Sequence, residues 1–94
     1  MNDSILTLHP EGKQGVNIGR HKYEIVREAI LEAIRCNGEL TFTEIRQEVE
    51  HQLIGTFYGA IPWYITTVKL DLEARHEIER IPSSRPQRFR LTQN

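Results

Sequence analysis

Cysteine is nearly absent from this chain, and long apolar runs are absent altogether. The one cysteine, Cys36, cannot form a disulfide within the chain, which excludes the disulfide-stabilised secreted scaffolds. No stretch reaches the roughly 18 consecutive apolar residues of a membrane span, and the N-terminal residues lack the apolar centre of a signal peptide. We therefore expect a reduced, cytoplasmic protein that does not enter a membrane.

A strong charge of one sign is also lacking, since 12 Lys and Arg face 13 Asp and Glu. The distribution is uneven, however. Residues 1–61 hold six basic and nine acidic side chains, whereas residues 62–94 hold six basic and four acidic ones. Arginine, which binds phosphate and carboxylate in a bidentate manner, supplies every cation after Lys69. These arginines are Arg75, Arg80, Arg85, Arg88 and Arg90.

The length leaves room for one small domain with a modest core. A hydrophobic content of 38% with 27% charged residues is typical of a folded globule. Residues 1–20, with one short apolar stretch at residues 5–8 and glycines spread over residues 12–19, indicate an extended N-terminal arm. We expect the folded domain to occupy residues 21–94.

Helical periodicity begins near residue 21 and is predicted to end at Asn37-Gly38, a left-handed cap. Thr41 to Glu44 fits a capping box, which predicts a second helix ending near Gly55. The first helix places its apolar residues on one face: Tyr23, Val26, Ile30, Ala33 and Ile34.

A third helix is predicted for about residues 62–75, because Pro62 suits a first turn and apolar residues follow at helical spacing. His76 can take the left-handed position after it. Residues 77–81 and 87–92 are rich in strand-forming residues, and residues 82–86 would join them as a hairpin loop. The inward stripe of the third helix is Ile61, Ile65, Val68 and Leu72.

This order of three helices followed by a two-stranded hairpin resembles a winged helix-turn-helix domain, an α+β fold, over residues 21–92. Residues 72–80, Leu72-Glu73-Ala74-Arg75-His76-Glu77-Ile78-Glu79-Arg80, resemble the passage from third helix to wing in bacterial winged helix regulators. Through residues 8–13 and 63–75, the whole chain is similar to a family of small, functionally uncharacterised bacterial proteins. That similarity carries no known activity.

The winged helix resemblance implies a DNA-binding protein, a possible transcriptional regulator that acts as a dimer on double-stranded DNA. In such proteins the third helix enters the major groove and the wing contacts the backbone. By position, the DNA contacts would come from Trp63, Tyr64, Thr66, Thr67, Lys69, Arg85 and Arg88.

An alternative uses the same fold as a protein-interaction or homodimerisation module that binds no nucleic acid. The second side of the third helix is apolar, and exposed apolar patches mark protein interfaces. Arg80, Arg88 and Arg90 of the wing would then pair with Glu77, Glu79 or acidic residues of the first helix. The N-terminal arm could also cover this side of the third helix. The contact would involve Trp63, Leu70, Ile5, Leu6 and Leu8.

Enzymatic motifs are lacking, and we expect no catalytic residue, metal, cofactor or small-molecule substrate. The four histidines fall on different elements without the spacing of a metal site. Cys36 has no identifiable histidine partner to activate it. Gly12 to Gly15 lacks the spacing of a phosphate-binding loop and is typical of a flexible turn.

Overall fold

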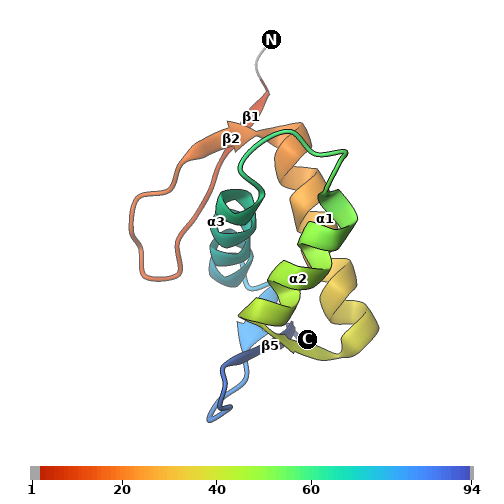
Figure 1. Ribbon diagram of the computed structural model, residues 1–94. Coiled ribbons are helices and arrows are strands. Elements are labelled where there is room, and N and C mark those ends of the chain that lie inside the picture. The colour runs from red at the N-terminus through yellow and green to blue at the C-terminus, as the bar shows by residue number, and fades with distance from the viewer. Residues whose placement is uncertain (1–2, 94) are drawn as a thin grey trace.

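The computed structural model describes residues 3–93 and has an α+β fold with three helices and two small antiparallel sheets (Figure 1). The three helices pack around one core. In chain order the elements are β1 (Ser4–Leu6), β2 (Asn17–Gly19), α1 (Arg20–Asn37), β3 (Glu39–Thr41), α2 (Phe42–Leu53), α3 (Ile61–Ala74), β4 (Ile78–Arg80) and β5 (Arg88–Leu91).

Helix α1 forms the centre of the core. Every residue of its predicted apolar face is buried, which confirms the periodicity. Gly38 follows with the predicted positive φ, 83°, and its N–H donates to the carbonyl of Ile34. Its ψ of −54° lies outside the left-handed helical region, so the cap is not the left-handed one that was predicted. His76 also has a positive φ, 62°, after α3, as predicted.

Helix α2 begins at the predicted capping box. The Glu44 amide donates to Thr41 Oγ1 at 3.1 Å, and the Thr41 amide donates to Glu44 Oε1 at 2.8 Å. The backbone hydrogen bond from Thr41 lowers the pKa of the Glu44 carboxyl. These reciprocal bonds set the start of α2 and therefore its angle to the preceding strand.

The C-terminal sheet has three strands, in the order β3-β5-β4, where the sequence predicted a two-stranded hairpin. The short link between the first two helices forms β3 and pairs with β5, placing Leu40 opposite Phe89. Both side chains are buried, so the link is fixed by the core. Three residues are too few to show the alternation that identifies a strand.

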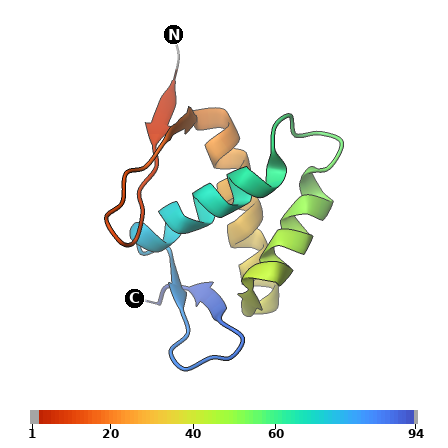
Figure 2. The same cartoon turned by 60° about the vertical axis from the view of Figure 1, so that its left-hand side comes forward.

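The N-terminal arm is a hairpin rather than a single extended segment. Strand β1 pairs with β2, which places Ile5 opposite Ile18. Below the strands, the Thr7 amide donates to the carbonyl of Val16 at 2.9 Å, and the Val16 amide donates to Thr7 Oγ1 at 3.0 Å. Figure 2 shows the loop between them beside α3.

Within residues 3–93, none of the helices is both long and apolar enough to cross a membrane. The arrangement of α2, α3 and the β4-β5 hairpin is compatible with a winged-helix-like layout.

Candidate functional site

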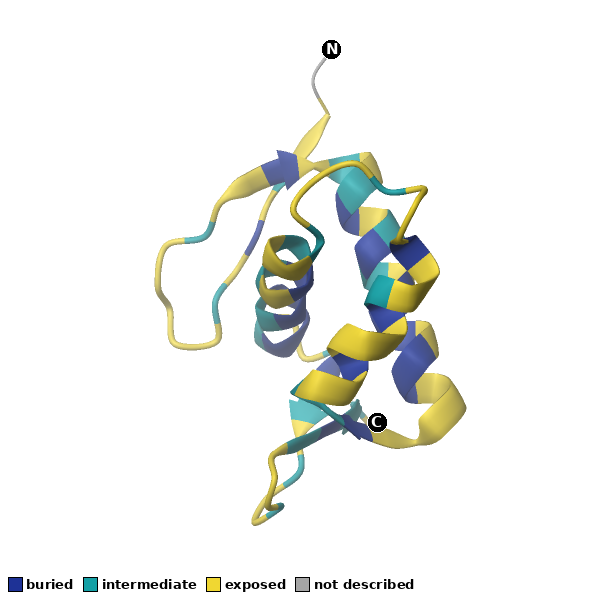
Figure 3. Ribbon diagram, viewed as in Figure 1, coloured by how far each residue is buried: buried dark blue, intermediate teal, exposed yellow. Residues whose placement is uncertain are grey.

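Helix α3 lies between the two hairpins, with the N-terminal arm on one side and the β4-β5 hairpin beyond its C-terminal end (Figure 2). One side of the helix faces the core and another is exposed (Figure 3). The core-facing side contains the predicted stripe, and Ile65, Val68 and Leu72 are fully buried. The exposed side and its borders are where a partner could be contacted.

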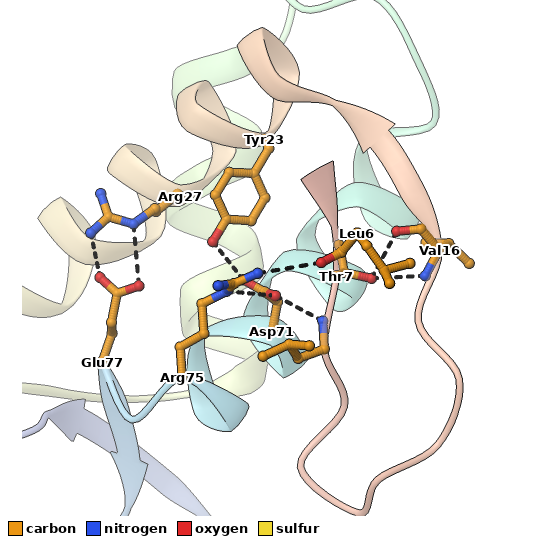
Figure 4. Close-up of polar contacts among 9 residues, drawn as sticks. Leu6, Thr7, Val16, Tyr23, Arg27, Asp71, Arg75 and Glu77 are labelled. Carbon is orange, nitrogen blue, oxygen red and sulfur yellow. Dashed lines mark hydrogen bonds and ion pairs between the residues drawn. The ribbon is translucent and has the colours of Figure 1, made fainter. Parts of the chain in front are cut away.

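A buried carboxylate on α3 anchors the N-terminal arm. Asp71 has no exposed surface, and its oxygens accept bonds from Tyr23 Oη at 2.5 Å, the Leu8 amide at 2.8 Å and Arg75 Nε at 2.9 Å (Figure 4). Arg75 also donates to the carbonyl of Leu6 at 3.3 Å. Asp71 thus joins α1, α3 and the arm in one network.

Tyr23 and its neighbours show how closed this network is. Burial, together with the hydrogen bond to Asp71, raises the pKa of the Tyr23 phenol well above its ordinary value. Arg27, one turn further along α1, pairs with Glu77, and that hydrogen bond raises the pKa of the Arg27 guanidinium. The polar groups in Figure 4 bond to one another, so we interpret this cluster as structural.

A second carboxylate on α3 anchors the C-terminal hairpin. Glu73 Oε1 accepts from Arg80 Nε at 2.6 Å, and Glu73 Oε2 lies 2.8 Å from Lys69 Nζ in an ionic contact. The contact between Glu73 Oε2 and Lys69 Nζ does not have the geometry of a hydrogen bond. The Lys69 ammonium also lies 4.4 Å from the ring centre of Phe89 and 5.2 Å from that of Phe42.

Lys69, which we expected at a DNA groove, is therefore in the interior and only 8% exposed. The reason is its position one helical turn after Ile65, which puts it at the edge of the buried stripe. With Lys69 turned inward, the residues of α3 that face solvent include no lysine or arginine.

Most C-terminal arginines have carboxylate partners, as the alternative reading anticipated. Arg75 pairs with Asp71, Arg80 with Glu73, and Arg90 with Glu79 at 2.6 Å. The partners differ in part from those considered, which were Glu77, Glu79 and the first helix.

Two arginines of the hairpin are held less firmly. Arg88 Nε lies 3.9 Å from Glu39 Oε1, and Arg85, exposed in the hairpin loop, has no carboxylate within 4.0 Å among residues 3–93. Arg85 and Arg88 are therefore the hairpin arginines least engaged by carboxylates among the described residues, which leaves them the most free to bind a phosphate.

The other predicted contact residues of α3 have different environments. Thr66 is exposed and Trp63 is 46% exposed. Tyr64 is partly buried, and its ring packs edge-on against Phe57, with centres 5.1 Å apart. Thr67 is partly covered by the arm. Trp63 and Thr66 are therefore the members most available to a ligand.

A pocket of about 130 Å³ lies between the arm and α3. Its helix wall is formed by Trp63, Thr67 and Leu70, and no lysine, arginine, aspartate or glutamate lines it. Leu8 and Val16 form part of the arm wall, and both are exposed. The pocket is comparable to the ~150 Å³ engineered cavity that holds benzene.

Ile5 and Leu6, the other arm residues of the predicted interface, differ in burial. Ile5 packs partly buried against the core, whereas Leu6 is exposed on the next position of β1. Of the predicted interface set, Leu8, Trp63 and Leu70 thus line the pocket, whereas Leu6 and Ile5 do not.

No group of three His, Cys, Asp or Glu side chains that could hold a metal occurs in the described part of the chain. The Asp71 and Glu73 clusters were not foreseen from the sequence. Their signal was spacing: Asp71 lies three residues after Val68, and Glu73 lies four after Lys69, so both fall near the buried stripe. A charged residue in such a position indicates a buried partner.

Comparisons with curated proteins and with solved structures gave no significant match. Residues 4–89, which include both hairpin anchors and the pocket, match a family of unknown function. The chain belongs to that family, DUF6958.

Proposed function

We propose that this chain is a winged-helix-like protein-interaction module that forms a homodimer through the pocket between the arm and α3. The supporting observation is the uncharged, exposed apolar lining of that pocket, formed in part by Leu8, Val16 and Trp63. Exposed apolar side chains gathered around a concavity are a feature of protein interfaces. The pocket has the size for one large apolar side chain from the other copy.

A second copy is the occupant that the charges favour. Two copies of the pocket surface can approach without like-charge repulsion, because the lining holds no lysine, arginine, aspartate or glutamate. A two-fold axis would bring each protruding Trp63 toward the partner's pocket. A stable dimer buries roughly 800 Å² per subunit, so the contact would extend over Leu6 and the outer side of the arm.

Duplex DNA is the second candidate, favoured by Arg85 and Thr66. Arg85, which pairs with no carboxylate in the described part of the chain, lies in the hairpin loop, where a wing would meet the phosphate backbone, and Thr66 is exposed on α3. With Arg85 and Arg88 as the accessible cations, each subunit would neutralise about two phosphates. A plot of the logarithm of the binding constant against the logarithm of the salt concentration would then have a slope of roughly −1.8 per subunit. So few phosphate contacts correspond to weak binding.

Sedimentation analysis tests the dimer. The expected result is a dimer at micromolar concentrations that becomes a monomer in Trp63→Ala and in Leu70→Glu. Tyr58→Ala is the matched control, because Tyr58 is 84% exposed but lies outside the pocket. A wild-type chain that stays monomeric at several hundred micromolar, or a dimer unaffected by either pocket variant, would disprove the proposal.

A fluorescence anisotropy titration with a random duplex, at low and moderate salt, tests the second candidate. The dimer proposal predicts no binding in the micromolar range. Salt-sensitive binding that is lost in Arg85→Ala/Arg88→Ala but retained in Lys13→Ala/Arg35→Ala would instead establish the DNA function. Lys13 and Arg35 are exposed cations outside the C-terminal hairpin, so this double variant controls for the loss of two positive charges alone.

A further inference from the structure

A second concave surface lies between α1 and the C-terminal end of α2, and it shares no residue with the pocket beside α3. It is an open groove of about 550 Å³. Its floor is apolar: Ala29 and Leu53 are buried members of the core, and Ile25 is partly exposed beside them. A groove of this kind can take the apolar side chains of another segment.

One rim of the groove is acidic. Glu24, Glu28 and Glu32 follow α1 at four-residue spacing and line the groove together, whereas no lysine or arginine lines it. One turn of helix separates successive carboxylates, so they form a row with a repeat of ~6 Å. The groove therefore combines an apolar floor with a row of negative charge.

The carboxylates of this rim are accessible to an incoming cation. All three glutamates are exposed, and Glu24 has no cationic partner within 4.0 Å among residues 3–93. Glu28 lies 3.5 Å from Arg27, and Glu32 pairs with Arg35 in the last turn of the helix. Exposed pairs of this kind contribute little and exchange readily for other partners.

We propose that this groove is a docking site for a basic amphipathic helix of a partner protein. Lysines or arginines at four-residue spacing on such a helix would match the repeat of the acidic rim, and aliphatic side chains between them would lie on Ile25 and Ala29. The sign of the rim disfavours nucleic acid and anionic membranes as occupants. This inference is independent of the dimer and of DNA binding, because it concerns other residues.

A designed peptide tests the inference on the intact chain. The probe is a fluorescein-labelled 18-residue helical peptide of Lys, Leu and Ala, with lysines four residues apart beside a leucine stripe. Its partner peptide has glutamate in place of every lysine. Fluorescence anisotropy gives the affinity, and amide chemical shifts in residues 21–32 and 52–53 show where the peptide binds.

The chain variant Glu24→Gln/Glu28→Gln/Glu32→Gln should bind the basic peptide about eightfold more weakly, since three exposed charge contacts of roughly twofold each are lost. The matched control, Glu11→Gln/Glu39→Gln/Glu48→Gln, removes the same charge from exposed sites outside the groove and should bind within twofold of wild type.

Four results would overturn the inference. These are no binding of the basic peptide at several hundred micromolar, equal binding of the acidic peptide, equal losses in the two triple variants, and shifts that lie outside the groove. All six substitutions are on exposed side chains, and circular dichroism of both triple variants shows that any loss is not due to unfolding.

Discussion

The two hairpins that flank α3 are each held by a buried carboxylate of that helix, but the two anchors are built differently. Asp71, which holds the N-terminal arm, accepts from a phenol, a backbone amide and a guanidinium, and it is completely buried. Glu73, which holds the C-terminal hairpin, faces the two cations of Lys69 and Arg80.

The difference lies in what each partner can do when the carboxylate is lost. The phenol and the Leu8 amide at Asp71 are fixed in place by the core and the backbone, so they would be left without an acceptor. Arg80 is 52% exposed along its side chain and can turn toward water. We infer that the arm is held more firmly than the hairpin.

Replacing Asp71 should therefore give the largest effect. Asp71→Ala removes the acceptor of three donors and leaves Arg75 without its partner, so the free energy of unfolding should fall by about 3–5 kcal/mol. Urea denaturation measures the loss, and hydrogen exchange should show the Leu8 amide exchanging faster. The control is Glu79→Ala, in a partly exposed pair with Arg90, with an expected change below ~1 kcal/mol. A loss for Asp71→Ala as small as that of the control would refute the tight anchor.

Glu73→Ala should lower the free energy of unfolding by less, about 2–3 kcal/mol, because only Lys69 is then left in the interior without a counter-charge. The double variant Lys69→Met/Glu73→Leu should recover most of that loss, since an apolar pair of similar size needs no counter-charge. Thermal and urea unfolding compare the two. If the double variant is less stable than Glu73→Ala, then the ion pair contributes more than its desolvation costs, and the comparison of the anchors fails.

The parts of the fold with a local cause could be predicted from the sequence. The capping box at Thr41, the positive φ at Gly38 and His76 and the core stripe of α1 depend on neighbours in the chain, and each is present. The third strand of the C-terminal sheet was missed, because β3 is only three residues long and is defined by its partner β5.

The residues of the candidate surface were predicted less well than the fold. Trp63 and Leu70 do lie together with the arm, since an apolar side on a helix seeks cover. Lys69 was predicted on the exposed side of the third helix because its side chain is charged, but it is buried. Its position one turn after Ile65 indicated the core. The pair of Arg75 with Asp71 has the i, i+4 spacing of one helix, but other arginine partners depend on contacts between distant segments, such as Arg27 with Glu77, which no spacing reveals.

The smallest of the expected effects concerns a single proton at the arm anchor. Tyr23→Phe removes one donor to Asp71 and should cost about 1.5 kcal/mol at neutral pH. Because burial and that hydrogen bond raise the pKa of the folded phenol, the unfolded chain loses this proton first, near pH 10, as the pH rises. Above that pH, the wild-type chain should lose up to about 1.4 kcal/mol of stability for each further pH unit. The Tyr23→Phe chain has no phenol at this position and should not show this loss.

Urea midpoints of both chains from pH 7 to pH 11 measure this effect as a difference. Other alkaline titrations cancel, including that of Cys36, whose pKa is raised by its hydrogen bond to Glu32. The stability advantage of wild type should be constant up to about pH 9 and should shrink above pH 10. An advantage that stays constant to pH 11 would mean that the phenol ionises as freely in the folded chain as in the unfolded one. The arm anchor would then be open to water, and no tighter than the hairpin anchor at Glu73.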